Sequence, residues 1–205
     1  TLRAQFRDPS LADRPYETDG WILTQPGKPY LDTLAYKWKP PKNTTIDFLA
    51  RRPPLGVLGR APYVDAPGCR LHFLFTGIQA EMFRALGLEK APGYPELFPE
   101  ERGRPYFPVQ FAPSDAPLAY LYQHPDRRPE GAGGEGWVAE VDGKILEMRC
   151  TDDCAAAGAL GVPAWGLVRL RADRAQEQKS GSYFGNDYRV AELNWLNYVD
   201  PFPEE

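Results

Sequence analysis

The sequence has few histidine and cysteine residues, the side chains suited to zinc binding and redox chemistry. Its 205 residues include two histidines and three cysteines, Cys69, Cys150 and Cys154. The cysteines lack the paired spacing of zinc sites, and no histidine lies near Cys150 and Cys154. We therefore interpret them as free thiols in a reducing compartment.

Long apolar runs and an excess of basic charge are also missing. No apolar run reaches membrane-spanning length and no signal peptide opens the chain, so we expect no membrane contact. The net charge is −4, so a nucleotide or RNA would have to bind a local basic cluster. There is no glycine-rich phosphate loop. The remaining composition, 42% hydrophobic and 25% charged, is typical of a globular protein of one to two small domains with a real core.

Residues 18–48 predict a pair of strands. The apolar run Trp21–Leu23 indicates a short, largely buried strand, and the turn residues Gln25–Pro29 follow it. Residues 34–39 predict the second strand. The stretch then continues into Asn43-Thr44-Thr45-Ile46-Asp47-Phe48.

Two lysines of the second strand carry the first candidate site. Alternation along a strand places Lys37 and Lys39 on one face. Two ammonium groups near the Asp19 carboxylate could form a cradle for phosphate and a divalent metal. The alternative is an edge strand whose lysines are solvated, which is common in sheets.

A basic cluster near the C-terminal end is the second candidate site. If residues 165–173 form a strand, Arg169, Arg171 and Asp173 share one face, and Arg174 lies just past its end. A carboxylate between guanidinium groups can fix their rotamers, and arginine binds phosphate oxygens in a bidentate manner. The alternative is a charged outer strand face. Pattern alone does not separate the two interpretations.

The rest of the chain predicts short strands between proline-rich loops. We expect strands at 71–75, 109–111 and 118–122, with His72 half-exposed. The Asp142-Gly143 turn predicts a hairpin of 137–141 with 144–150. We expect a helix over 78–86, a polar loop over 176–182, and a short helix capped by Asn186 or Asp187. Several short strands with one helix suit a small Greek-key barrel of the OB type.

Four aromatic residues gather in the proline-punctuated loop 91–108. They could stack RNA bases or pin the loop to the core, and we favour packing. The four are Tyr94, Phe98, Tyr106 and Phe107.

These motifs resemble those of the covalent nucleotidyltransferases, the superfamily of mRNA-capping guanylyltransferases and polynucleotide ligases. Asp19-Gly20 is similar to the family's acid–glycine metal motif, and Lys37-Trp38-Lys39-Pro40 to its paired-lysine motif. The run 45–48 is similar to the segment that leads into the second domain, and Trp165–Arg174 to the lid motif, with Arg174 where lysine is usual. The run KWKPP-x-NTTIDF favours the capping branch, in particular the multidomain enzymes of large DNA viruses or protists.

The resemblance implies a mainly β fold with α elements. It predicts the end of an ATP-grasp-like nucleotidyltransferase sheet in residues 1–42 and an OB-fold barrel with a helical insertion in 43–184. Residues 185–205 would be a linker toward a further domain, which in such enzymes is a cap methyltransferase. The family's nucleophilic lysine stands in a Lys-x-Asp-Gly motif that these 205 residues lack, so we expect a fragment that is inactive alone.

The resemblance also implies the roles of the candidate residues. Asp19 would hold Mg²⁺ or Mn²⁺, and Lys37 and Lys39 would bind the α-phosphate region of GTP. Arg171 and Arg174 would bind its outer phosphates. Three further residues would support them: Asp173, Asp47 and Arg169.

The implied partners are GTP and the 5′ end of RNA, and the implied location is intracellular, in the nucleus or in the cytoplasm, where it could be a viral factory or a virion. Two alternatives stay open: a fragment of an ATP-dependent polynucleotide ligase, and a non-catalytic OB-fold module that binds RNA or docks a neighbouring domain.

Overall fold

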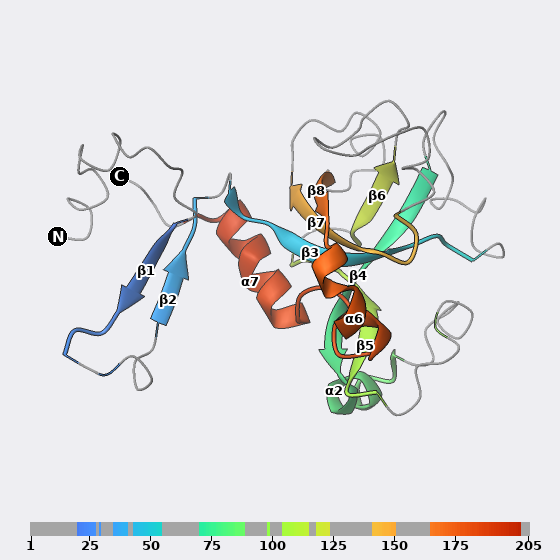
Figure 1. Ribbon diagram of the computed structural model, residues 1–205, viewed down its shortest axis with the longest axis horizontal. Coiled ribbons are helices and arrows are strands. Elements are labelled where there is room, and N and C mark those ends of the chain that lie inside the picture. The colour runs from blue at the N-terminus through green and yellow to red at the C-terminus, as the bar shows by residue number, and fades with distance from the viewer. Residues whose placement is uncertain are drawn as a thin grey trace. The chain divides into compact units, whose positions relative to one another are not determined.

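The computed structural model divides the chain into two compact units (Figure 1). Unit 1 comprises Thr1–Thr44 and Leu196–Glu205, and unit 2 comprises Thr45–Trp195. The structure describes residues 20–27, 29, 35–40, 43–54, 70–88, 98, 104–114, 118–123, 141–150 and 165–201.

Unit 1 contains the predicted pair of strands. Strands β1 (Trp21–Thr24) and β2 (Ala35–Trp38) are antiparallel, with Ile22 opposite Lys37. The turn after β1 holds Gly27 at φ 79°, which favours glycine. The expected burial of β1 is wrong for Ile22, which is 66% exposed, because a two-stranded ribbon covers little of its own surface.

Unit 2 is built on one antiparallel sheet. Its strands are β3 (Ile46–Arg51), β4 (Arg70–Gln79), β5 (Tyr106–Gln110), β6 (Tyr120–Gln123), β7 (Ile145–Cys150) and β8 (Trp165–Leu170). The order is β5-β4-β3-β7-β8, and β6 pairs with the first half of β4. The predicted mainly β fold with α elements is therefore confirmed.

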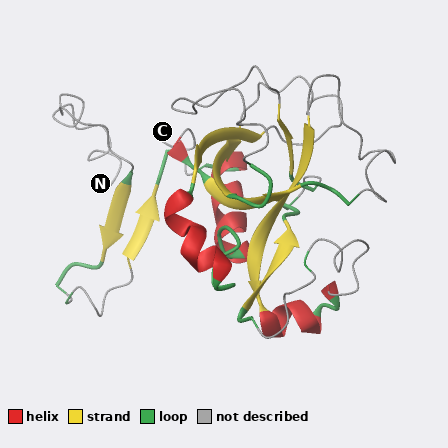
Figure 2. Ribbon diagram, turned by 45° about the vertical axis from the view of Figure 1, so that its right-hand side comes forward, coloured by secondary structure: helices red, strands yellow, loops and turns green. Residues whose placement is uncertain are grey.

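The sheet is strongly curled (Figure 2), and Cα atoms of β6 and β8 come within 8 Å of each other. Among the residues that the structure describes, no backbone ladder joins these two strands. Closure into an OB-type barrel therefore stays a prediction.

Aromatic residues form much of the core around β3. Phe48 is fully buried, and its ring centroid lies 5.5 Å from that of Phe111 and 5.0 Å from that of Trp165. Phe98 and Phe107 are also buried, which confirms the packing interpretation for these two aromatics of the 91–108 loop. Tyr106 is half-buried and packs against the core, whereas Tyr94 lies outside the described residues.

The prediction of a half-exposed His72 is wrong, because the residue is 1% exposed. It lies on β4, which has β3 on one edge and β5 and β6 on the other. A central strand covered on both faces buries positions that alternation assigns to solvent.

Helix α2 (Ala80–Ala85) is shorter than predicted and buries a different face. Strand β4 continues to Gln79, and the helix ends before Gly87 at φ 65°, as expected. Phe83 is 2% exposed, whereas Met82 and Leu86, on the expected apolar stripe, are 40% and 60% exposed. One turn and a half of helix anchors through a single aromatic side chain, which stacks on Phe107 at 4.6 Å.

Two further helical segments follow β8. The predicted polar loop at 176–182 is wrong in its first part, because the 3₁₀ turn η5 (Ala172–Arg174) continues into helix α6 (Ala175–Lys179). Helix α7 (Tyr188–Val199) confirms the last predicted helix and extends it. The Asp187 carboxylate accepts the Arg189 backbone N–H at 3.0 Å, so Asp187 is the cap. In the described part of the chain no helix has the length and apolar composition needed to cross a membrane.

The predicted hairpin of 137–141 with 144–150 is wrong for its second strand. Both edges of β7 are taken, by β3 on one side and β8 on the other. The Asp142-Gly143 turn instead holds the end of β3, since Gly143 N–H donates to the Ala50 carbonyl at 2.8 Å. Residues 137–140 lie outside the described part of the chain.

Candidate functional site: an arginine–carboxylate cluster

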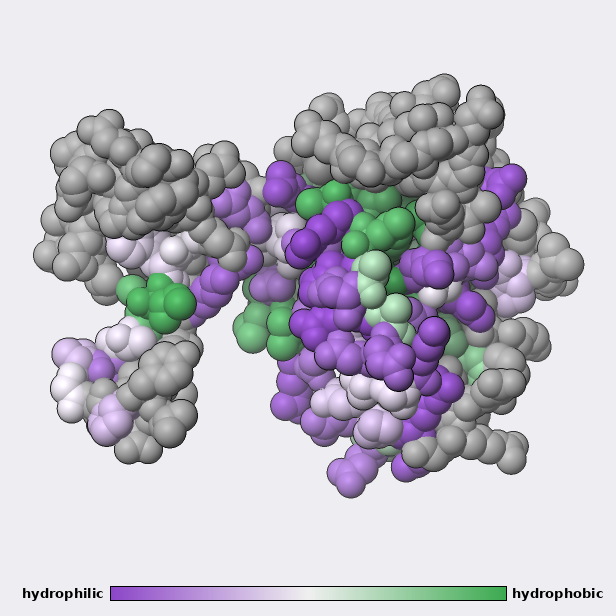
Figure 3. All heavy atoms as spheres, viewed as in Figure 1, coloured by the Kyte–Doolittle hydropathy of each residue, from purple (hydrophilic) through white to green (hydrophobic). Residues whose placement is uncertain are grey.

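The arginine motif lies where β8 ends and turns back. The Arg171 N–H donates to the Ile145 carbonyl at 2.9 Å, and the Arg174 N–H then donates to the Arg171 carbonyl at 3.0 Å. The prediction that one strand runs to Asp173 is therefore wrong, because β8 ends at Leu170. The 3₁₀ turn, rather than strand alternation, places Asp173 beside the Arg171 side chain. Hydrophilic side chains gather on the face of unit 2 around α6 (Figure 3).

Cross-strand register brings two acids together at this end of the sheet. Asp47 of β3 stands opposite Glu147 of β7, and Glu147 stands opposite Arg169 of β8. Like charges directly opposite each other destabilise a sheet, so this cross-strand row of Asp47 and Glu147 needs cations nearby. Arg171 supplies one: its Nη1 lies 2.5 Å from Asp47 Oδ2 and 4.0 Å from Glu147 Oε2.

Arg171 is committed to carboxylates through all three of its side-chain nitrogens. Nη1 binds Asp47, whereas Nε and Nη2 bind the two oxygens of Asp173 at 2.8–3.3 Å. Its side chain is 13% exposed, and that of Asp47 is 7% exposed. The hydrogen bond that Arg171 donates to Asp173 is the largest cause of the raised pKa of Arg171. Arg171 is therefore a largely buried cation that joins β3 to the 3₁₀ turn through hydrogen bonds from each of its three nitrogens.

Arg174 differs from Arg171 in its partners and in its exposure. Its Nη1 donates to both Glu177 oxygens at 2.8–2.9 Å, and its guanidinium lies 4.9 Å from the centroid of the Tyr183 ring. Its Nε is buried and has no hydrogen-bond partner among the described residues, although Asp173 Oδ2 lies 3.8 Å away. The side chain is 37% exposed. Arg174 is thus the more exposed arginine of this pair, and its carboxylate partners are themselves exposed.

Arg169 forms an outer pair on the same row. Its Nε donates to Glu147 Oε2 at 2.6 Å, and Thr45 donates to the other Glu147 oxygen at 3.0 Å. The Arg169 side chain is 62% exposed, so solvent screens this pair far more than the Asp47–Arg171 pair.

Two carboxylates of the cluster, Asp173 and Glu147, have lowered pKa values. The hydrogen bond from Arg171 lowers the pKa of Asp173 from 3.8 to about 2. Burial raises the pKa of Glu147, but hydrogen bonds from Arg169 and Thr45 and the arginine charges outweigh burial and leave it below 4.5. Both groups are therefore ionised at neutral pH.

These lowered pKa values predict how the stability of unit 2 depends on pH. A carboxyl group whose pKa is lower in the folded state stabilises the fold above its unfolded pKa, and this contribution is lost as pH falls through the folded pKa. For Asp173 the loss runs from its ordinary 3.8 to about 2. We expect Asp173→Asn to make the unfolding free energy less dependent on pH in this window. Urea unfolding of both proteins across it measures the effect, and equal slopes would contradict the assignment.

The two lysines belong to unit 1. Lys37 is exposed on β2, and Lys39, just after that strand, is half-exposed. The Asn197 side chain donates to the Lys39 carbonyl at 3.1 Å and to Thr44 Oγ1 at 2.9 Å, so the last turn of α7 holds the backbone at Lys39. Asp19 lies outside the described residues. The convergence of the lysines and the arginines on one triphosphate stays a prediction.

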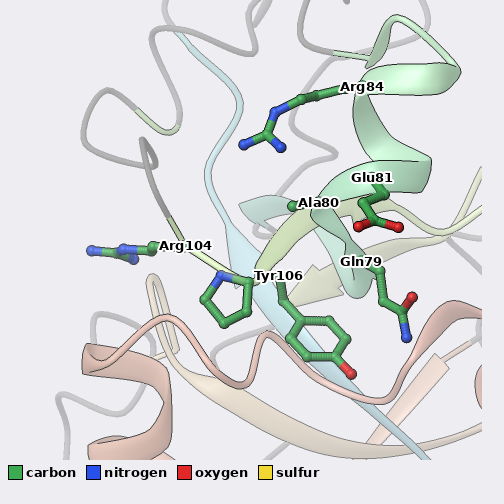
Figure 4. Close-up of a pocket in the computed structure, with 7 residues that line it drawn as sticks. Gln79, Ala80, Glu81, Arg84, Arg104 and Tyr106 are labelled. Atoms are coloured by element: carbon green, nitrogen blue, oxygen red, sulfur yellow. The ribbon is translucent and has the colours of Figure 1, made fainter.

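A pocket lies beside α2. Its volume is about 580 Å³, and it shares no residue with the arginine cluster. Arg84 extends from α2 over this hollow, whereas Arg104 points away from the other labelled side chains (Figure 4). The lining residues are Gln79, Ala80, Glu81, Arg84, Arg104, Pro105 and Tyr106. The charges of this lining are of both signs.

Sequence reasoning missed three residues of the cluster. Glu147 was expected only as part of a strand, Glu177 as part of a polar loop, and Tyr183 had no role. A signal for Glu177 does exist, since an acid three residues after Arg174 faces it once the turn is helical. Glu147 and Tyr183 reach the site through register and loop docking, for which the sequence carries no local signal.

A mainly β fold with a guanidinium–carboxylate cluster at a strand end is the arrangement that the resemblance to nucleotidyltransferases implied. The comparison with known proteins shows that the chain is related to the mRNA-capping enzymes of a large DNA virus. It is 47% identical over 193 residues, 94% of its length, to the mRNA-capping enzymes of African swine fever virus from a Kenyan pig isolate and from a South African tick isolate. The same values hold for a Namibian warthog isolate. The chain spans 21% of each of these relatives. No family profile matches the chain.

Proposed function

We propose that this chain is part of an mRNA guanylyltransferase that transfers GMP from GTP to the 5′-diphosphate end of RNA. The observation that carries the proposal is the 47% identity, over nearly the whole chain, to viral mRNA-capping enzymes. That match spans the paired-lysine stretch and the arginine cluster together, because it covers 94% of the chain.

In the proposed reaction a lysine outside these residues attacks the α-phosphorus of GTP. A P–N bond forms, the bond to the β-phosphate breaks, and pyrophosphate leaves. A terminal phosphate oxygen of the RNA then attacks the same phosphorus and releases the lysine. Each step develops charge on phosphate oxygens, so cations placed at those oxygens lower the barrier.

Residues of this chain would each bind a different part of the triphosphate. Lys37 and Lys39 bind the α-phosphate region, and Arg174 binds the outer phosphates. Arg171 already binds Asp47 and Asp173, so its direct contact with phosphate would use a second N–H of Nη1 or Nη2, or would follow displacement of Asp173, which is 59% exposed. Asp47 positions Arg171. A divalent metal held with the help of Asp19 would neutralise phosphate charge.

A chimera tests the proposal. The matched segment of the African swine fever virus enzyme is replaced by this chain, and the protein is incubated with [α-³²P]GTP. We expect a covalent protein–GMP adduct. Lys37→Ala or Lys39→Ala should abolish labelling, because each removes an ammonium group from the reacting phosphate, while Lys144→Ala, at an exposed turn position, should not.

The outcomes separate the alternatives. Labelling by [α-³²P]ATP but not GTP would favour a polynucleotide ligase. A folded chimera that takes label from neither nucleotide would favour a non-catalytic module. Full labelling of both lysine variants would contradict the proposed phosphate contacts. We further propose that a cap methyltransferase domain belongs to the same polypeptide, as the resemblance implies.

A further inference from the structure

Tyr183, in the segment between α6 and α7, contacts both halves of the arginine cluster. Its hydroxyl donates to Asp47 Oδ2 at 2.7 Å, the same oxygen that Arg171 binds. Its ring lies under the Arg174 guanidinium at 4.9 Å, which is within cation–π range. One side chain thus touches Arg174 directly and Arg171 through a shared carboxylate.

Backbone contacts fix the segment that carries Tyr183. The Asp47 N–H donates to Asn186 Oδ1 at 2.8 Å, and the Asn186 N–H donates to the Asp47 carbonyl at 2.8 Å. The Gly77 N–H donates to the Asn186 carbonyl at 2.9 Å. Asn186 therefore binds β3 and β4 together, and the position of Tyr183 relative to Asp47 follows from it.

The phenol remains a hydrogen-bond donor under ordinary conditions. Burial is the largest cause of the raised pKa of Tyr183, and its hydrogen bond to Asp47 raises the pKa further. The neutral hydroxyl can therefore donate to the carboxylate throughout the neutral and mildly basic range.

We propose that Tyr183 is a positioning residue that orders the Arg171 and Arg174 side chains before phosphate arrives. This inference rests on the proposed function for its ligand, the phosphate chain of a nucleoside triphosphate. Arginine side chains have many rotamers, and ordering them before binding reduces the entropy lost on binding. Tyr183 does so by two separable means, its hydroxyl for Arg171 and its ring for Arg174.

Two variants of Tyr183 separate the contribution of its hydroxyl from that of its ring. Tyr183→Phe keeps the ring and removes the hydroxyl, so Arg171 should lose order while Arg174 changes little. Tyr183→Leu removes both, so both arginines should lose order. Tyr188→Phe is the matched control, because its hydroxyl donates to the Ala112 carbonyl at 2.7 Å, away from the cluster.

Side-chain NMR of the 205-residue chain reads out the order of each arginine separately. We expect rotation about the Nε–Cζ bond of Arg171 to speed up several-fold in Tyr183→Phe, and that of both arginines in Tyr183→Leu. Titration with inorganic tripolyphosphate should show roughly threefold to tenfold weaker affinity for Tyr183→Phe than for the wild type or Tyr188→Phe.

The result that overturns the inference is an unchanged Arg171 signal in folded Tyr183→Phe, and this variant decides the question even if Tyr183→Leu does not fold. A different result tests the proposed function. If the arginine signals respond to the variants as expected but tripolyphosphate does not bind the wild type, the positioning role of Tyr183 stands and the phosphate site is rejected.

Discussion

Asp47→Ala is expected to lower the free energy of unfolding of unit 2 by about 3–5 kcal/mol, the usual cost of removing one partner from a buried ion pair. The Asp47 side chain is 7% exposed and that of Arg171 is 13% exposed, so water cannot replace the lost carboxylate easily. The Tyr183 hydroxyl would lose its acceptor at the same time. Urea unfolding followed by tryptophan fluorescence measures the change, with Trp165 and Trp195 reporting from unit 2.

Two further variants show whether the loss of stability comes from the buried ion pair. Arg169→Ala breaks the exposed pair with Glu147 and should cost less than about 1 kcal/mol, because solvent screens it. The double variant Asp47→Leu, Arg171→Met leaves no unpaired buried charge at this position and should recover part of the loss. If Asp47→Ala costs no more than Arg169→Ala, the buried pair is not a major source of stability.

Gly185→Ala is the second change with a large expected effect. Gly185 has φ 101°, and a Cβ there would overlap the Asp47 carbonyl oxygen and lie 3.0 Å from Phe48 Cα. Both obstacles are backbone atoms of β3, which cannot move without breaking the sheet. We expect a loss of about 4 kcal/mol or more in unfolding free energy, measured by urea unfolding.

Gly87→Ala is the matched control for this substitution. Gly87 has φ 65°, but no atom of the described residues lies within 4 Å of the position that a Cβ would take. It should therefore show the conformational cost alone, about 1–2 kcal/mol. Equal losses in the two variants would mean that β3 yields to the added methyl group, and the docking of the 183–187 segment would then be looser than the contacts indicate.

The contacts separate two arginines that the motif treats as equivalent. Arg171 holds β3, β7 and the 3₁₀ turn together through three carboxylates, two of them largely buried. Arg174 pairs with two exposed carboxylates, Glu177 and the more distant Asp173, and with one aromatic ring. We expect substitution of Arg171 to affect folding and phosphate binding together. Substitution of Arg174 should affect phosphate binding with less effect on stability. The motif therefore combines a structural arginine with one suited to bind a ligand.

Local patterns predicted the elements whose signals are local. The apolar run at Trp21 and the turn at Gly27 gave the first pair of strands, and Asp187 gave the cap of α7. The predictions were wrong where pairing with a distant strand determined the local structure. The Asp142-Gly143 turn was assigned to a hairpin, but β3 and β8 occupy both edges of β7.

For the candidate site, too, local motifs predicted some features and tertiary pairing determined the others. The residue types and spacing of Arg169, Arg171, Asp173 and Arg174 identified a cationic cluster, and the resemblance connected it with Asp47. The sequence could not show that Asp47 and Glu147 share a row across the sheet, since that depends on register between strands 100 residues apart along the chain.

The sequence by itself determined three features of this protein: local clusters of cations, few histidine and cysteine side chains, and a mainly β chain related to viral capping enzymes. These follow from composition and from short motifs, which act at the scale of a few residues. The tertiary structure decided which arginine pairs with a buried carboxylate, which is more exposed, and that Tyr183 contacts Arg174 directly and Arg171 through Asp47. Such assignments depend on pairing and docking between distant segments, and the free energy of burial and hydrogen bonding that selects them exists only once the sheet has formed.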